Sequence, residues 1–297
     1  MLSPLLFITV MDEIVKEAKE AYGDREMKLM IFADDIVLWG SSSEEVQEQL
    51  NILNNIVEKY GMKFSVEKSK TMVVTRGERE GKGSVKIRDE ELEVVSSFKY
   101  LGSELTQDAR LTNEISRRVQ QSNSFYQSVR NLVWNKEIPR KCKEVMYKMY
   151  YSPILTYAAE TWTMTRREES KIQASEMRFL RSMIGKTRRD RVRNEDVRKE
   201  IGVDKMNDRI ERNRLRWFGH VKRMEEGRLP KRMMEMKFEG KRARGRPRTR
   251  WMDSIKNSFM RRDLDWDKIE KEEWWKERGK WRSTINASTR RELDKRK

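Results

Sequence analysis

Cysteine and histidine are almost absent from this sequence of 297 residues, which contains one of each, Cys142 and His220. A single cysteine excludes a disulfide bond within the chain. A zinc site built from cysteine and histidine within one chain is excluded as well, because such a site needs about four nitrogen or sulfur ligands. A Ser-His-Asp triad would have to form around His220, which lies in a basic helical segment, so we do not favour that class of hydrolase.

Long apolar runs are also missing, since none approaches the roughly 18 residues that a membrane span requires. The apolar stretch at residues 1–11 has no basic segment before it and no small-residue cleavage site, and Asp12 and Glu13 follow at once. It therefore does not have the pattern of a signal peptide. The sequence predicts a soluble nuclear or cytoplasmic protein that is neither secreted nor bound to a membrane.

Positive charge is abundant and unevenly distributed. The chain has 66 Lys and Arg against 49 Asp and Glu, a formal net charge of +17. Residues 1–100 carry a net charge of −5, so the remainder, residues 101–297, carries +22. A basic segment of this size indicates a polyanionic partner such as nucleic acid, although a merely solvated basic surface would have the same composition.

The first hundred residues mix helical and strand-like patterns. Residues 11–22 have apolar side chains at helical spacing, and the capping-type sequence of residues 41–45 predicts a second helix that runs to about Tyr60. Two apolar runs, residues 28–33 and 36–39, flank a short turn and predict a β-hairpin that is buried on both faces. Further strands are expected at the following places: residues 64–66, residues 71–74 and a small hairpin within residues 85–95.

Beyond Gly102 the apolar residues recur at helical spacing to the end of the chain. Pro139 is expected to open one of these helices and Pro153 to interrupt it, and Trp217 falls on the apolar stripe of another. Residues 241–250 hold six basic residues with glycine and proline, so we expect a linker or arm there. The predicted fold class is α+β, a small antiparallel sheet with helices followed by an all-helical region.

Asp34 and Asp35 stand at the turn of the predicted hairpin. Aspartate is a common turn residue, so the pair alone does not establish a site. Rigid carboxylates without a nearby histidine or cysteine nevertheless suit oxygen-preferring ions such as Mg²⁺ or Mn²⁺. Two such ions can activate a hydroxyl and stabilise a pyrophosphate leaving group in nucleotidyl transfer. The pair is therefore a candidate metal site.

The segment Phe32-Ala-Asp-Asp35, followed by Ile-Val-Leu-Trp39, resembles the catalytic hairpin of reverse transcriptases from non-LTR (LINE-type) retrotransposons. Three other segments resemble motifs of that family in the same order. Residues 2–7 are similar to the motif that contacts template and nucleotide, residues 61–70 to the next palm motif, and residues 98–102 to the primer-grip turn. The resemblance covers residues 2–102.

This resemblance implies RNA-directed DNA synthesis on an RNA template and a DNA primer or target, with Mg²⁺ or Mn²⁺ as cofactor. Asp34 would be the principal metal ligand and Asp35 a second ligand. Lys68 would lie near the leaving pyrophosphate, unless it is simply solvated. The primer end would be placed by three residues that otherwise form an ordinary turn: Tyr100, Leu101 and Gly102.

The sequence departs from the family in one respect. The family's polymerases carry another metal-binding aspartate on a strand upstream of the hairpin, and neither Asp12 nor Asp24 stands at the matching place. The resemblance therefore predicts the C-terminal part of a larger polymerase, inactive alone, whose partner would be the missing N-terminal segment. We expect three parts: a partial palm at 1–106, a helical thumb at 107–185 and a basic extension at 186–297. The alternative is a non-catalytic nucleic-acid-binding protein derived from a retroelement.

Two basic segments are candidates for contact with nucleic acid. Arg117 and Arg118 are expected opposite the apolar stripe of their helix, where they would follow a phosphate backbone or simply be solvated. Arg244 and Arg246 belong to Arg-Gly-Arg-Pro247, which resembles the core of an AT-hook, a minor-groove binder. The alternative, a basic linker or a nuclear-targeting patch, is the one that we favour for this segment.

Overall fold

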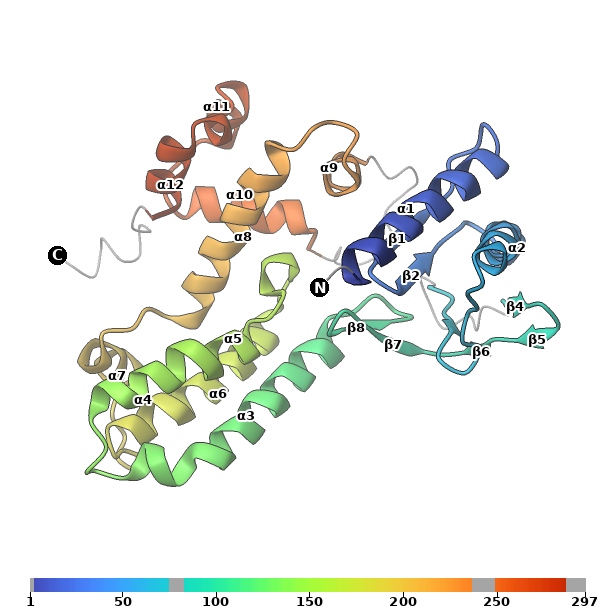
Figure 1. Cartoon of the computed structure of the whole chain (residues 1–297). Helices are drawn as coiled ribbons and strands as arrows, with labels where there is room; N and C mark the ends of the chain where they lie inside the picture. The colour runs from blue at the N-terminus through green and yellow to red at the C-terminus, as the bar shows by residue number, and fades with distance from the viewer. Residues whose placement is uncertain (1–2, 75–82, 237–248, 287–297) are drawn as a thin grey trace. The chain divides into compact units, whose positions relative to one another are not determined.

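The computed structural model describes residues 3–74, 83–236 and 249–286 of the chain. The chain forms two compact units, unit 1 (Met1–Arg110) and unit 2 (Leu111–Lys297), which follow each other in sequence (Figure 1). In the described residues, unit 1 combines helices with short strands, whereas the regular elements of unit 2 are all helical. The predicted α+β class, with a helical second part, is confirmed. No helix in the described ranges is both long and apolar enough to span a membrane.

Two helices, α1 (Ser3–Ala21) and α2 (Ser43–Lys59), carry the core of unit 1. The hydroxyl of Ser42 caps α2 by accepting a hydrogen bond from the backbone N–H of Glu45 at 3.3 Å, as the serine-rich start predicts. Ile14 of α1 and Leu53 of α2 are fully buried in the shared core. The first helix begins well before residue 11, because the apolar N-terminal residues continue the same helical pattern.

The strands are short and pair two by two. The pairs are β1 (Leu29–Phe32) with β2 (Asp35–Leu38), β3 (Lys70–Thr71) with β6 (Glu93–Val94), β4 (Lys86–Ile87) with β5 (Glu90–Glu91), and β7 (Ser97–Tyr100) with β8 (Ser103–Thr106). The β3–β6 pair is parallel and the other three pairs are antiparallel. The predicted hairpins around the aspartate pair and within residues 85–95 are therefore present.

The expectation that both faces of the β1–β2 hairpin are buried is wrong. Leu29 and Ile31 pack against the core of unit 1, whereas Met30 and Phe32 alternate outward, and Phe32 is 62% exposed. A sheet of only two strands has one face against the helices, so the period-2 alternation exposes every second side chain of β1.

The predicted strand at residues 64–66 does not form, and a turn at residues 66–68 follows instead. The backbone N–H of Ser69 donates to the carbonyl oxygens of Ser65 and Val66 at 3.0 and 3.2 Å. The Ser65 hydroxyl also accepts from the N–H of Lys68 at 3.4 Å, a local bond that competes with strand formation. Of the strand expected at residues 71–74, only Thr71 is part of β3.

Unit 2 is built from a succession of helices and helical turns. They are α3 (Thr112–Trp134), α4 (Arg140–Met146), the π-helical turn η1 (Tyr147–Tyr151), α5 (Ser152–Leu155), the 3₁₀ turn η2 (Ala159–Thr161), α6 (Arg166–Met183), α7 (Asn194–Ile201), α8 (Met206–Lys222), α9 (Leu229–Glu235), α10 (Trp251–Met260), α11 (Trp266–Lys271), the 3₁₀ turn η3 (Trp274–Lys276) and α12 (Arg278–Asn286). Pro139 precedes α4 as predicted. Pro153 does not interrupt the helical path, because the π-helical turn before it widens the helix where a proline would otherwise clash.

Two apolar cores hold unit 2 together. The first extends from α3 to the start of α8 and centres on Phe179, whose ring lies 4.5 Å from that of Tyr151, centroid to centroid. The second joins α8 to α10–α12 around Phe218, whose ring meets tryptophans 251, 266, 275 and 281 at centroid distances of 5.7–6.2 Å. Trp217, expected in the core, is only half-buried and contacts His220, because the adjacent residue Phe218 occupies the inward position.

Candidate metal and nucleic-acid site

The tip of the β1–β2 hairpin carries both aspartates. Phe32 pairs with Asp35, so Ala33 and Asp34 form a two-residue loop between the strands. Asp34 and Asp35 are both exposed, which leaves their carboxylates accessible to an ion from solvent. Ala33 has a φ of +53°, a left-handed conformation that costs a residue with a Cβ about 1–3 kcal/mol. Strain of this kind is often found at functional sites, although several other non-glycine residues of the described ranges also have a positive φ.

The second hairpin, β7–β8, also has a two-residue tip, in which both residues have a positive φ. Tyr100 pairs with Ser103, and the two loop residues Leu101 and Gly102 have φ values of +45° and +81°. Two successive positive φ values are typical of the tightest hairpin turns, whose first position normally holds asparagine, aspartate or glycine. A leucine there is strained, so the predicted primer-grip turn is also a strained hairpin tip.

Tyr100 and Asp35 connect the two hairpins. Burial raises the pKa of the Tyr100 phenol, and the negative charge of Asp35 raises it further. An electrostatic influence of this kind requires the two groups to be near each other, although the residues belong to separate hairpins of unit 1. The charge of Asp35, on the hairpin with the aspartate pair, is thus felt at Tyr100, where the predicted primer-grip turn begins.

Lys68 lies on the turn that precedes β3 and is exposed. Within the part of the chain that the structure describes, no hydrogen bond or ion pair joins its ammonium group to Asp34 or Asp35. The structure therefore does not join Lys68 to the aspartate pair.

The carboxylates at the hairpin are the right type of ligand for a divalent cation, but there are too few of them to hold one. Carboxylate oxygens are the ligands that Mg²⁺ and Mn²⁺ prefer. However, the described residues contain no group of three or more Asp, Glu, His or Cys side chains that would hold a metal ion. Asp34 and Asp35 are thus at most part of a metal site within these ranges.

The predicted position of Arg118 is wrong. Its side chain is buried in unit 2, at 7% exposure, where it donates to the Glu114 carboxylate at 2.6 Å and lies 4.3 Å from the centre of the Tyr157 ring. Arg117 is half-buried and bonds to the same carboxylate. Glu114, one turn earlier in α3, pairs with both arginines, and Tyr157, in the turn between α5 and η2, covers Arg118. Arg244 and Arg246 lie outside the described residues.

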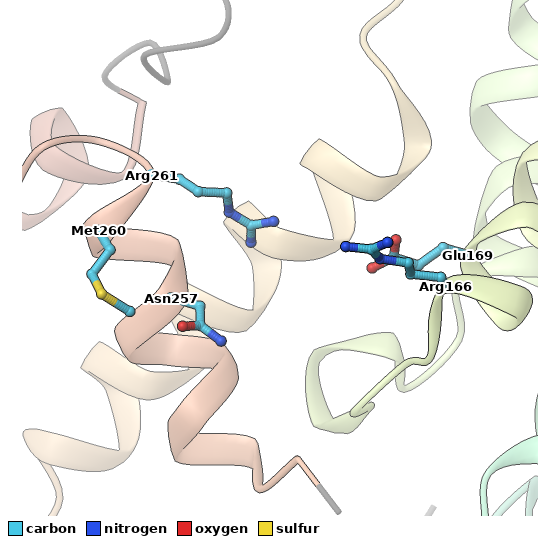
Figure 2. Close-up of a pocket in the computed structure, with 5 residues that line it drawn as sticks. All are labelled: Arg166, Glu169, Asn257, Met260 and Arg261. Atoms are coloured by element: carbon cyan, nitrogen blue, oxygen red, sulfur yellow. The ribbon is translucent and has the colours of Figure 1, made fainter. Parts of the chain in front are cut away.

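Unit 2 also contains a cavity that the sequence did not predict. It has a volume of about 520 Å³ and lies between α6, which contributes Arg166 and Glu169, and the α10 segment, which contributes Asn257, Met260 and Arg261 (Figure 2). Burial raises the pKa of Glu169. These residues are far apart in the sequence, so no local pattern could have grouped them, and none of the predicted site residues lines the cavity.

Comparison with known proteins finds a family match that covers most of unit 1. Residues 1–105 match the family model described as reverse transcriptase (RNA-dependent DNA polymerase). This segment belongs to the reverse transcriptase family. The matched range includes both strained hairpin tips, so the aspartate pair and the Tyr100 turn lie within the reverse transcriptase segment.

The similarity continues beyond the reverse transcriptase segment. A transposon-derived protein of Caenorhabditis elegans is 26% identical to this chain over 278 residues, an alignment that covers 89% of this chain and 97% of the relative. Coverage of that extent must include most of unit 2 as well as unit 1. The similarity to this relative therefore spans both units of the chain.

Proposed function

We propose that this chain derives from a non-LTR retrotransposon and that unit 1 supplies part of the active site of its RNA-directed DNA polymerase. The observation that carries this proposal is the aspartate pair on a strained hairpin tip, near Tyr100, within a segment of the reverse transcriptase family. The substrates are an RNA template and a DNA primer or target. Association with them places the protein in the nucleus or the cytoplasm.

In this proposal Asp34 and Asp35 bind Mg²⁺ or Mn²⁺ together with a further carboxylate that the described residues do not provide. Tyr100, Leu101 and Gly102 support the primer end beside the metal. Lys68 approaches the leaving pyrophosphate only when the nucleotide is bound, since no hydrogen bond or ion pair of the described residues joins it to the aspartates otherwise. Residues 107–185 act as a thumb and residues 186–297 as a basic extension. By itself, the chain does not extend a primer.

Metal binding tests the first part of this proposal. Mn²⁺ titration of the full chain, followed by electron paramagnetic resonance, should reveal weak binding that the double variant Asp34→Asn/Asp35→Asn abolishes. Asp12→Asn is a suitable control, because Asp12 is exposed and already pairs with Lys16 at 2.8 Å. Equal Mn²⁺ binding by the wild type and the double variant would contradict the proposal.

Primer extension on an RNA template tests the second part. The purified chain should show no Mg²⁺-dependent synthesis, and a polymerase segment that supplies the missing carboxylate should restore it. Strong synthesis by the chain alone would contradict the proposal that its active site lacks a carboxylate. If Asp34→Ala abolished that synthesis, the role of Asp34 as a metal ligand would still be supported.

A second candidate function is a non-catalytic nucleic-acid-binding protein in which unit 1 is only a scaffold. Two observations favour it: the described residues offer no complete metal site, and the excess positive charge belongs to the helical part of the chain. Under this alternative, Mn²⁺ would not bind at Asp34 and Asp35, and an added polymerase segment would not restore synthesis.

A further inference from the structure

The loop between α6 and α7 has an unusual density of positive charge. In residues 185–193, five basic side chains accompany a single acid, and all five are exposed. They are Lys186, Arg188, Arg189, Arg191 and Arg193. This group is called the α6–α7 basic loop.

The single acid of the loop, Asp190, forms its hydrogen bonds with Thr187 and not with an arginine. The Asp190 carboxylate accepts hydrogen bonds from the N–H of Thr187 at 2.6 Å and from its hydroxyl at 2.8 Å. These bonds are the main reason why the pKa of Asp190 is lowered. None of the four arginines of the loop forms an ion pair with a carboxylate of the described residues. The guanidinium groups are therefore available to another anion.

The loop is also held in one conformation. Arg181 of α6 donates to the carbonyl oxygen of Val192 at 3.2 Å and to the side-chain oxygen of Asn194 at 2.5 Å, so it ties the end of the loop to the helix. The Thr187 hydroxyl accepts from the N–H of Arg189 at 3.1 Å. Arg191 adopts a left-handed backbone with φ of +53°, which persists only where surrounding bonds impose it.

Among the described residues of unit 2, the positive charge of the loop also acts on Arg181 of α6. Burial lowers the pKa of Arg181, and the charges of Arg188 and Arg198 lower it further. The Nε atom of Arg181 is buried without a hydrogen-bond partner in the described ranges. The C-terminal end of α6 attracts cations, but a helix end is equivalent to only about half a charge. An anion at the loop would relieve the remaining repulsion.

We propose that the α6–α7 basic loop binds the sugar–phosphate backbone of nucleic acid without reading its sequence. Arginine suits this role, because its planar guanidinium donates two parallel hydrogen bonds to phosphate oxygens. An ordered loop loses less conformational entropy on binding than flexible side chains on a mobile segment would. The inference rests on the proposed function only in taking nucleic acid as the ligand. It assigns a contact surface in unit 2 that is independent of Asp34 and Asp35.

The salt dependence of DNA binding tests this inference. A 20-base-pair DNA duplex is titrated with the full chain and with the triple variant Arg188→Gln/Arg189→Gln/Arg191→Gln at several salt concentrations. Each lost phosphate contact lowers the slope of log Kd against log salt by about 0.9, so we expect a decrease of about 2.7 for three contacts. An unchanged slope would overturn the proposal.

A matched control removes the same charge elsewhere in unit 2. The triple variant Lys148→Gln/Lys276→Gln/Lys280→Gln loses three lysines that already pair with glutamates on the surface. Its slope should stay close to that of the wild type. If both triple variants lowered the slope equally, the effect would come from net charge alone and the loop would not be a site.

A single substitution separates binding from folding. Arg191→Gly removes one guanidinium and also relieves the left-handed backbone strain. It should weaken duplex binding while raising the thermal midpoint, an outcome that damage to the fold cannot produce. Unchanged binding would count against the loop. Since Mn²⁺ binding at the hairpin is measured separately, failure of this inference and failure of the proposed function are distinguishable.

Discussion

Gly219 lies directly against the indole ring of Trp281. A Cβ atom placed on Gly219 would stand 2.1 Å from the Nε1 atom of Trp281, which donates a hydrogen bond to the carbonyl oxygen of Leu215 at 3.1 Å. Because Gly219 has no side chain, α12 approaches α8 closely enough for the Trp281 indole to donate a hydrogen bond to the backbone of α8. This contact closes the aromatic core around Phe218.

The first prediction concerns this contact. Gly219→Ala should destabilise unit 2 by about 1–3 kcal/mol, the usual cost of overpacking, because the Trp281 ring must move and its hydrogen bond is lost. Thermal or urea unfolding measures the change. Gly279→Ala in α12 is the control, since a Cβ there meets no atom within 4 Å and should stabilise the helix slightly. Equal effects of the two substitutions would show that the contact is unimportant.

Local features of the structure followed from the sequence, and distant ones did not. The hairpin around Asp34, the cap at Ser42 and the helical second part depend on neighbouring residues, so apolar spacing and turn chemistry predict them. The burial of Arg118 depends on Tyr157, which lies in a turn some forty residues later in the chain. No periodicity within one helix contains that information.

The candidate site shows the same division. Motif order indicated that Asp35 and Tyr100 both belong to a site, but their electrostatic contact is a property of the folded unit. The positions of Trp217 and Phe218 show the limit of helical periodicity. Adjacent residues differ by about 100° around a helix, so a small rotation of α8 decides which ring enters the core.

The second prediction concerns the electrostatic contact between the two hairpins. Asp35→Asn removes the negative charge that helps to raise the pKa of Tyr100, so this pKa should fall but remain above its ordinary value because burial persists. Titration of ¹³C-labelled tyrosine by nuclear magnetic resonance measures it. Glu67→Gln, which removes an exposed negative charge of the same unit, should leave the Tyr100 titration unchanged. A Tyr100 pKa that is insensitive to Asp35→Asn would show that the hairpins are apart.

The third prediction concerns alkaline pH. Burial raises the pKa of Tyr151 to about 12, and burial together with Glu176 raises the pKa of Tyr147. In the unfolded chain both phenols titrate near pH 10. Above pH 10 the unfolded state therefore loses protons that the folded state keeps, so the free energy of unfolding decreases. The stability that the two buried phenols contribute is complete below pH 10 and is lost as the pH rises toward 12. Each tyrosine contributes at most about 1.4 kcal/mol per pH unit.

Urea unfolding of the full chain between pH 9 and pH 11.5 measures this slope. Tyr151→Phe removes one of the two groups, so its free energy of unfolding should fall less steeply with pH than that of the wild type, whatever its stability at pH 9. Parallel slopes for the two proteins would contradict the assignment.

The fourth prediction concerns the buried ion pair of the first core. Arg198 donates to the Glu176 carboxylate at 2.7 Å, the Tyr147 hydroxyl donates to the other oxygen at 2.8 Å, and both charged side chains are buried. Arg198→Met leaves Glu176 as an uncompensated buried charge and should cost about 3–5 kcal/mol of stability.

The double variant Glu176→Gln/Arg198→Met tests this explanation, because it removes both charges and keeps an oxygen for the Tyr147 hydroxyl. The double variant should be more stable than Arg198→Met alone, even though it changes two side chains instead of one. Urea unfolding of the two single variants and the double variant gives the coupling energy directly. Additive losses would mean that Glu176 and Arg198 stabilise unit 2 through packing and not through their charges.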